Sequence, residues 1–377
     1  MSKKIVFGVV AVLMFAVIGG LLTTHLVGSA LSAKIGSVDV PDSTLASAQP
    51  LPQNFLSALS TPSDGKPVNI LVIGSDTRSG ENSKYGETST FDTARSDTTM
   101  LVHLSGDRTR ATVMSVPRDL WIKIPSCALA DGSVSPASEN RFNSAYSTAG
   151  AACTVKTFTT LTNIPVNHVI EVDFTGFKKI VDTVGGIDVC VREPINDPDA
   201  QLNLPVGQYT VDGEQALGLA RARYTLGDGS DISRIQRQQI LLRSMISKIK
   251  NSATLTDPAR MYQVLSDTMD SISADKNLRS LPALATLAWQ ARDISQNNIE
   301  FITIPTTDRG DGATVSMNAA EAKKMFNTII QDRNLSATPS PASSADSNSE
   351  LPATGENPEF TVNSDGTEPA CTIPPIN

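Results

Sequence analysis

Short apolar runs alternate with stretches of helical periodicity from about residue 66 onward, and this alternation limits the possible folds more than any other feature of the chain. Buried strands are expected in VNILVIGSD (68–76), DTTMLVHLS (97–105), RATVMSVPRD (110–119), HVIEVDF, IDVCV and IEFITIP. Helices are expected within 141–162, with a break at Gly150, and over 231–250. Strands that alternate with helices predict an α/β protein, specifically an α-β-α sandwich around a central mixed sheet.

The N-terminus predicts a membrane anchor. Residues 5–22 contain no charged residue, and weaker apolar character continues to residue 27, which is about the length that spans a bilayer. Two lysines precede this segment, so the positive-inside rule places residues 1–4 in the cytoplasm and the rest of the chain outside. We therefore expect a single-pass protein of the cell membrane with a transmembrane helix at 5–27. The alternative is a cleaved signal peptide, because small residues near position 30 are suited to cleavage.

Composition divides the remainder of the chain into three parts. Residues 28–65 are rich in Ser, Ala and Pro and are expected to form a linker, 66–334 the extracytoplasmic catalytic domain, and 335–377 a disordered tail. The formal net charge is −8, and the tail holds six acidic residues but no Lys or Arg, so the rest of the chain carries only −2. Without a basic face, a nucleic-acid partner is not expected.

The four cysteines predict disulfides. Their number is even, the domain is expected outside the membrane, and none of them forms a CxxC pair that would suggest zinc. Four cysteines allow three pairings. We favour Cys127–Cys153 together with Cys190–Cys371, because the first two flank one loop-rich region and the tail cysteine has only long-range partners.

Charged residues lie at the ends of three predicted strands. They are Asp76 and Arg78 after the first, Arg95 and Asp97 before the second, and Arg118 and Asp119 after the third. Ligands of open α/β sheets bind at such edges. Each of these residues, taken singly, could also cap a turn or pair with a neighbour.

A second group of charges lies in RARYTLGDGSDISRIQRQQI (221–240). This stretch holds Arg221, Arg223, Arg234 and Arg237 but no lysine, and arginine is preferred where a planar fork binds phosphate or carboxylate. Only three histidines occur in the chain and no Ser-His-Asp set is evident, which disfavours a histidine-dependent hydrolase. Carboxylates combined with arginines suit phosphoryl transfer, in which Mg²⁺ is held by one or two carboxylates and the substrate's phosphates.

Five segments in this order, NILVIGSDTR, RSDTTMLVHL, SVPRDLWIKIP, VDFTGFKKIVDTVGGIDV and RARYTLGDGSDISRIQRQQ, resemble the LytR-CpsA-Psr (LCP) family over about residues 66–250. The cysteine pattern resembles the actinobacterial branch. The resemblance implies a membrane-anchored, extracytoplasmic phosphotransferase that takes a glycopolymer from a polyprenyl-pyrophosphate carrier. The acceptor would be a hydroxyl of peptidoglycan or of a surface glycoprotein, and polyprenyl phosphate would be released.

The same resemblance implies roles for individual residues. Asp76 and Asp97 would hold Mg²⁺, and either could orient or deprotonate the acceptor. The pyrophosphate would be bound by Arg78, Arg118, Arg221, Arg223, Arg237 and Gln238. Replacing Arg118, Arg221 or Arg223 by Ala is expected to cost about 2–4 kcal/mol of transition-state stabilisation with little effect on folding.

Two other functions remain open at this point. One is a pyrophosphatase that acts on the same lipid carrier with water as acceptor, and the other is a non-catalytic binder of lipid-linked glycopolymer. The sequence does not identify the site of the polyprenyl chain. Apolar helical faces at Phe158, Leu161, Phe174, Phe177, Ile180 and Val181 could line it, although core packing is their more common role.

Overall fold

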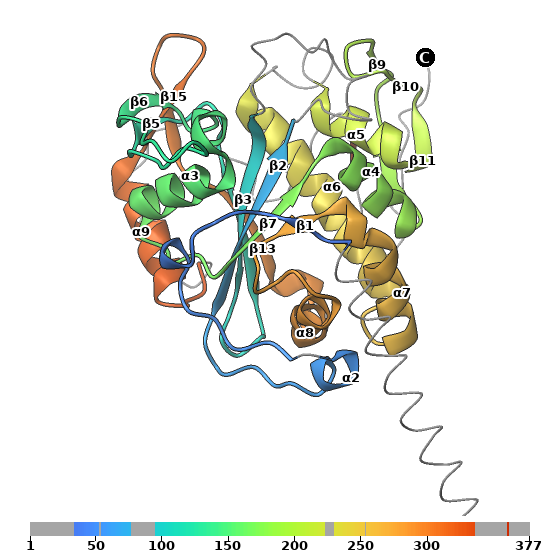
Figure 1. Ribbon diagram of the computed structural model, residues 1–377. Coiled ribbons are helices and arrows are strands. Elements are labelled where there is room, and N and C mark those ends of the chain that lie inside the picture. The colour runs from blue at the N-terminus through green and yellow to red at the C-terminus, as the bar shows by residue number, and fades with distance from the viewer. Residues whose placement is uncertain are drawn as a thin grey trace, which may run out of the picture.

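The computed structural model describes residues 34–52, 54–76, 95–222, 230–252, 254–335 and 360–361. A seven-stranded sheet in the order β1-β12-β7-β2-β3-β4-β13 lies at its centre (Figure 1). The strands are β1 (Gly36–Ser37), β2 (Val68–Ser75), β3 (Ser96–Leu104), β4 (Ala111–Val116), β7 (His168–Val172), β12 (Ser273–Ala274) and β13 (Ile299–Thr303). β2, β3 and β4 pair antiparallel, whereas β7 joins β2 and β13 joins β4 in parallel. The predicted central mixed sheet is confirmed.

Alternation along the central strands separates two cores. Leu71 and Ile73 of β2 pack in one core with side chains of α3 (Ser144–Thr162) and α9 (Ala319–Ile330). Ile70 is buried in the other core with side chains of α8 (Leu281–Ala291). Figure 1 shows these helices on opposite sides of the sheet. Because both faces are covered, the strands read as nearly continuous apolar runs, which is why they are recognisable in the sequence.

A third core lies beside the sheet. It packs α4 (Phe174–Thr183), α5 (Gly213–Arg221) and α6 (Asp231–Asn251) against β8 (Ile187–Val191), β9 (Ile195–Asp197), β10 (Leu202–Leu204) and β11 (Gly207–Val211). Asp173 caps α4 by accepting from the Gly176 amide, and Asp212 caps α5 in a capping box with Gln215. The two helices pack closely at Gly213, where an added Cβ would lie 2.4 Å from the Lys178 carbonyl oxygen. Only glycine fits there.

Smaller elements complete the described structure. They are the hairpins β5 (Trp121–Ile124)–β6 (Ser138–Arg141) and β14 (Thr306–Asp308)–β15 (Val315–Met317), helices α2 (Phe55–Ala58) and α7 (Pro258–Thr268), and 3₁₀ turns at Asp42–Thr44, Met269–Ser271 and Gln296–Asn298. The two hairpins were not expected. Their strands are only three or four residues long, too short for a clear periodic signal.

The expected linker at 28–65 needs correction from residue 34 onward. β1 pairs with β12 at the edge of the central sheet, and the neighbouring Ile35 and Val38 are buried in its cores. These contacts are made by single apolar residues within a segment rich in Ser and Pro. The overall composition of the segment therefore did not indicate that it packs against the sheet. The predicted transmembrane helix at 5–27 lies outside the described residues. Within those residues, no helix is long and apolar enough to cross a bilayer.

Most of the tail at 335–377 also lies outside the described residues. The exception beyond residue 335 is β16 (Phe360–Thr361), which pairs antiparallel with β8 and places Phe360 opposite Val191. These two residues therefore form part of a three-stranded sheet, β11-β8-β16, which the expectation of a disordered tail did not include.

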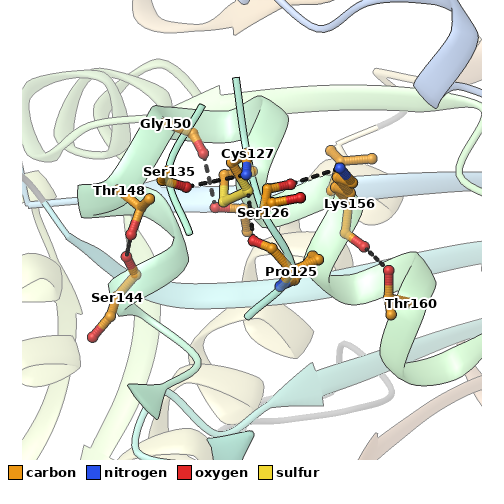
Figure 2. Close-up of a disulfide and its surroundings, with 12 residues drawn as sticks. Pro125, Ser126, Cys127, Ser135, Ser144, Thr148, Gly150, Lys156 and Thr160 are labelled. Carbon is orange, nitrogen blue, oxygen red and sulfur yellow. Dashed lines mark hydrogen bonds between the residues drawn. A yellow bond between two sulfur atoms is a disulfide. The ribbon is translucent and has the colours of Figure 1, made fainter. Parts of the chain in front are cut away.

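Cys127 and Cys153 form a disulfide that links the segment after β5 to α3 (Figure 2). Around it, the Cys127 amide donates to Ser135 Oγ at 3.1 Å and Lys156 Nζ donates to the Ser126 carbonyl at 2.6 Å. The bridge lies just after the break in α3 at Gly150, which adopts a φ of 61°. Cys190 is buried in β8 and disulfide-bonded, and its predicted partner Cys371 lies outside the described residues.

Candidate functional site

Two carboxylates lie where β2 ends and β3 begins. Asp76 follows β2, and its carboxylate and amide both hydrogen bond with the backbone of Arg95. The two strands pair Gly74 with Thr98 but Ser75 with Ser96, so Asp97 is the additional residue of a β-bulge. A bulge interrupts regular alternation and redirects a side chain. This local irregularity presents Asp97 at the sheet edge, beside Arg118.

Arg118 is surrounded by three carboxylates. Its Nη1 donates to Asp97 Oδ1 at 2.8 Å, and its Nε lies 3.3 Å from Asp119 Oδ2 and 3.4 Å from Asp231 Oδ1. Burial lowers the pKa of Arg118, but attraction to Asp97, Asp119 and Asp231 outweighs burial and raises it. The guanidinium is therefore permanently charged and held in one orientation.

Arg234, in the first turn of α6, belongs to the same cluster. Its Nη2 donates to Asp231 Oδ1 at 2.6 Å and to the Asp97 carbonyl at 3.1 Å. Burial raises the pKa of Asp231, and the charges of Arg234 and Arg118 oppose that shift only in part. Neither Asp231 nor Arg234 was assigned a role from the sequence. Their three-residue spacing on a predicted helix was the signal that could have paired them.

A cavity of about 390 Å³ lies between the sheet edge and helices α4, α5 and α6. Its polar lining includes three guanidinium groups, four carboxylates and the amide of Gln238; the charged residues are Arg118, Arg221, Arg234, Asp97, Asp173, Asp197 and Asp199. Its apolar lining includes Val72, Met100, Phe174, Phe177, Ile180 and Leu241. Guanidinium groups and an apolar surface in one cavity suit a ligand that combines an anionic group with a hydrocarbon portion.

The predicted site residues therefore separate into three groups. Asp97, Arg118, Arg221 and Gln238 line the cavity, and Asp76 directly follows the lining residue Ser75. Arg78 and Arg223 lie outside the described residues.

Arg237 is placed differently from the expectation. It is fully buried, donates to the Ser233 hydroxyl and the Ala222 carbonyl, and is not among the described residues that line the cavity. It joins the end of α5 to α6 rather than pointing at a ligand. Arg221 lies over the ring of Phe174, with 5.1 Å between its Cζ atom and the ring centre.

Of the apolar helical residues that were considered for the polyprenyl chain, some line the cavity and others pack in the hydrophobic cores. Phe174, Phe177 and Ile180 of α4 line the cavity. Val181 packs in the core beside it, whereas Phe158 and Leu161 of α3 pack in the core on the opposite face of the sheet. Helical periodicity identified apolar faces but did not reveal which side of the sheet each helix covers.

The surroundings of Arg118 argue against the expectation that its loss has little effect on folding. Its side chain is only 13% exposed, and its removal leaves three carboxylates without their shared cation. Removing one partner from a buried ion pair is strongly destabilising because the remaining charge is uncompensated. We therefore expect the loss of Arg118 to lower stability as well as to alter the site.

A tyrosine and a glutamate that were not predicted lie near Asp76. The Tyr146 hydroxyl donates to the Glu171 carboxylate. Burial raises the pKa of Tyr146, and the hydrogen bond to Glu171 raises it further, while Asp76 adds a smaller effect of the same sign. Tyr146 therefore stays protonated at neutral pH and holds the Glu171 carboxylate by its hydrogen bond.

The carboxylates fit a Mg²⁺ that binds together with a phosphorylated substrate. Within the described residues, no group of three or more His, Cys, Asp or Glu side chains could enclose a metal. Mg²⁺ requires only one or two carboxylates when phosphate oxygens and water complete its shell. Asp76, directly after β2, and Asp97, in the neighbouring β3, are the two carboxylates that the sequence assigned to such an ion.

Comparisons with known proteins agree with this architecture. Residues 38–331 match the LytR_cpsA_psr family. The cell wall biosynthesis protein LcpA of Corynebacterium glutamicum is 28% identical over 315 residues, which cover 74% of this chain and 58% of that protein. A Bacillus anthracis protein named polyisoprenyl-teichoic acid–peptidoglycan teichoic acid transferase TagU is 31% identical over 258 residues, covering 68% of this chain and 75% of that protein.

A solved structure shows the same fold. The LytR-Csp2A-Psr enzyme from Actinomyces oris aligns with a TM-score of 0.57 at 24% identity, covering 78% of this chain and 95% of that one. The present chain spans less than two thirds of the length of LcpA and of a second corynebacterial relative, LcpB. The family match extends over most of the described structure, from the residues before β2 to the end of α9. The chain therefore belongs to the LytR-CpsA-Psr family.

Proposed function

We propose that this protein is a phosphotransferase that moves a glycopolymer from a polyprenyl-pyrophosphate carrier to a hydroxyl of a cell-wall acceptor. The acceptor would be peptidoglycan or a surface glycoprotein. The observation that carries the proposal is a single cavity that is lined both by guanidinium groups and by apolar side chains of α4. The guanidinium groups belong to Arg118, Arg221 and Arg234. A lipid diphosphate has this combination of an anionic group and a long hydrocarbon.

The chemistry follows from the charges around the cavity. The acceptor hydroxyl attacks the phosphorus that carries the glycan, the bond from this phosphorus to the bridging oxygen breaks, and polyprenyl phosphate leaves with that oxygen. Negative charge develops on the leaving phosphate, and preorganised guanidinium groups stabilise such charge without reorganisation. Arg118 is suited to this task because three carboxylates already hold its orientation.

The carboxylates at the sheet edge would serve the other half of the reaction. Asp76 or Asp97 would accept the proton of the acceptor hydroxyl. The hydrogen-bonded pair of Tyr146 and Glu171 would support the part of the site that contains Asp76. A Mg²⁺ held by Asp76 and Asp97 would neutralise diphosphate charge. We further propose that the segment at 5–27 anchors the chain in the cell membrane, so that the catalytic domain acts outside the cell next to its lipid substrate.

The test is an incubation of the full chain with a polyprenyl-pyrophosphate-linked glycan and Mg²⁺, with and without a peptidoglycan acceptor. Transfer requires acceptor-dependent release of polyprenyl phosphate and covalent labelling of the acceptor. Release at the same rate without acceptor would instead identify a pyrophosphatase. No release in either case would leave a non-catalytic binder, and chelation with EDTA tests the metal.

A further inference from the structure

A second, polar cavity of about 280 Å³ lies beside the cluster that Arg118 forms with its three carboxylates. It is lined by Arg95, Asn140, Arg141, Asn143, Ser144 and Ser147. These residues come from the segment before β3, the end of β6 and the start of α3, the last two of which lie side by side in Figure 1. Among the described residues, the lining contains two guanidinium groups, two side-chain amides and two hydroxyls, and no carboxylate.

Within the described residues, this cavity shares no lining residue with the cavity that the apolar side chains of α4 line. The two are connected through contacts of Arg118, which lines the apolar cavity. Arg141 Nη1 lies 3.6 Å from Asp119 Oδ1, and Asp119 in turn contacts Arg118. The backbone N–H of Asn143 donates to the Arg118 carbonyl at 3.1 Å. On the other side, Arg95 exchanges hydrogen bonds with Asp76. The polar cavity is therefore adjacent to both strand ends that supply the carboxylates of the site.

The lining selects a class of ligand. Guanidinium forks bind carboxylate or phosphate with two donors, and amides and hydroxyls bind sugar hydroxyls in either hydrogen-bonding sense. The volume corresponds to roughly nine water molecules at about 30 Å³ each, which is enough for one sugar ring. Arg141 shares Asp119 with Arg118, so this single carboxylate serves two cations.

We infer that this cavity binds one anionic sugar unit, bearing a phosphate or a carboxylate, next to the phosphorus that is transferred. The inference rests on the proposed transferase function and narrows its substrate class. If the lipid tail fills the apolar cavity, the sugar must lie on another side of the diphosphate, and the polar cavity offers that place. The sugar could belong to the glycan of the donor or to the acceptor, because both end at the same phosphorus.

Steady-state kinetics on the full chain distinguish these two sources. Arg141→Gln and Asn140→Ala alter the cavity, and Lys123→Ala is the matched control because it removes a cation from the same β5–β6 hairpin outside the lining. Loss of one charge-assisted hydrogen bond in Arg141→Gln should raise one KM about 10- to 100-fold, with kcat changed less than about threefold. A change in the acceptor KM places the acceptor sugar in the cavity, and a change in the donor KM places the donor sugar there. Asn140→Ala should raise the same KM by a smaller factor.

A binding measurement provides a readout that does not depend on activity. The chain has two tryptophans, and Trp121 lies opposite Arg141 in the β5–β6 pair, so Trp289→Phe leaves Trp121 as the single reporter. Glucuronic acid and glucose 1-phosphate should change its fluorescence at concentrations at least tenfold lower than glucose does, and Arg141→Gln should abolish that preference.

Two results would overturn the inference: an equal response to glucose and to the acidic sugars, or unchanged KM values in both cavity variants while the wild type still transfers. Failure of the wild type to transfer would instead remove the proposed function. The fluorescence titration would then still decide whether the cavity binds acidic sugars.

Discussion

Replacing Arg118 by Ala removes one guanidinium from Asp97, Asp119 and Asp231 at the same time. In catalysis, the variant loses one or two charge-assisted bonds to the diphosphate. This loss amounts to about 2–4 kcal/mol in the transition state, or about 30- to 1000-fold in kcat/KM. Arg118→Lys should recover only part of this loss, since an ammonium group supplies the charge without the planar fork.

The same substitution should lower stability. Loss of one partner of a buried ion pair costs about 3–5 kcal/mol, but here Asp97 is 29% exposed and Asp231 keeps Arg234, so we expect about 2–3 kcal/mol. For a domain of this size that corresponds to a decrease in Tm of about 3–5 °C. Lys248→Ala is the control, because it breaks a more exposed pair with Asp188 and should cost no more than about 1 kcal/mol.

The pH dependence of unfolding tests whether the loss of stability in Arg118→Ala is caused by carboxylates that have lost their cation. The pKa of Asp231 is already raised by burial, and removing Arg118 takes away one of the two cations that oppose this shift. A carboxyl with a raised folded-state pKa binds its proton more tightly in the folded state than in the unfolded state. The stability deficit of Arg118→Ala is therefore largest above that raised pKa and decreases as pH falls through it.

Thermal unfolding of wild type, Arg118→Ala and Arg118→Lys between pH 4.5 and 8, alongside transfer assays at neutral pH, measures both effects. The reasoning is refuted if the difference in Tm between wild type and Arg118→Ala is the same at every pH. It is also refuted if Arg118→Ala retains more than about a third of wild-type kcat/KM.

Three further predictions concern other parts of the molecule. Ala220→Trp should fill the apolar cavity that Ala220 lines and raise the KM for a long-chain polyprenyl donor at least tenfold, while a water-soluble short-chain donor is less affected; equal effects on both donors would argue against a lipid in this cavity. Burial lowers the pKa of His103, so as pH falls below about 6.5 the unfolded chain takes up a proton that the folded one does not, and stability decreases. Urea unfolding of His103→Gln at pH 7.5 and 5.5 should show a smaller decrease than wild type, and an identical decrease would contradict this assignment. Cys127→Ser together with Cys153→Ser opens a loop of 26 residues and should cost about 3–4 kcal/mol in the chain-entropy account; a change in Tm below 2 °C would show that the bridge adds little.

Local patterns in the sequence were sufficient for the central architecture. The runs that became β2, β3, β4 and β8 are short, apolar and rich in β-branched residues because most of their residues are buried in the folded chain. The runs that became β7 and β13 have the same composition, although most of their residues are only half-buried. Helix α6 begins at Asp231, and its apolar residues recur at helical spacing, so its position was also predictable. The placement of Asp76, Asp97 and Arg118 at strand ends follows from the same patterns.

Only the tertiary structure decided which of these charges meet and which way they point. The register shift that makes Asp97 a bulge residue depends on how β2 and β3 pair, and a single-residue shift is invisible in either strand alone. Arg234 and Arg237 lie one helical turn apart and look equivalent in the sequence. The packing of α6 against α5 and the sheet turns Arg234 toward Asp97 and the cavity, whereas it turns Arg237 toward the carbonyl of Ala222. Helix periodicity defines a buried face, but the neighbour that covers that face is set by contacts between residues far apart in the chain.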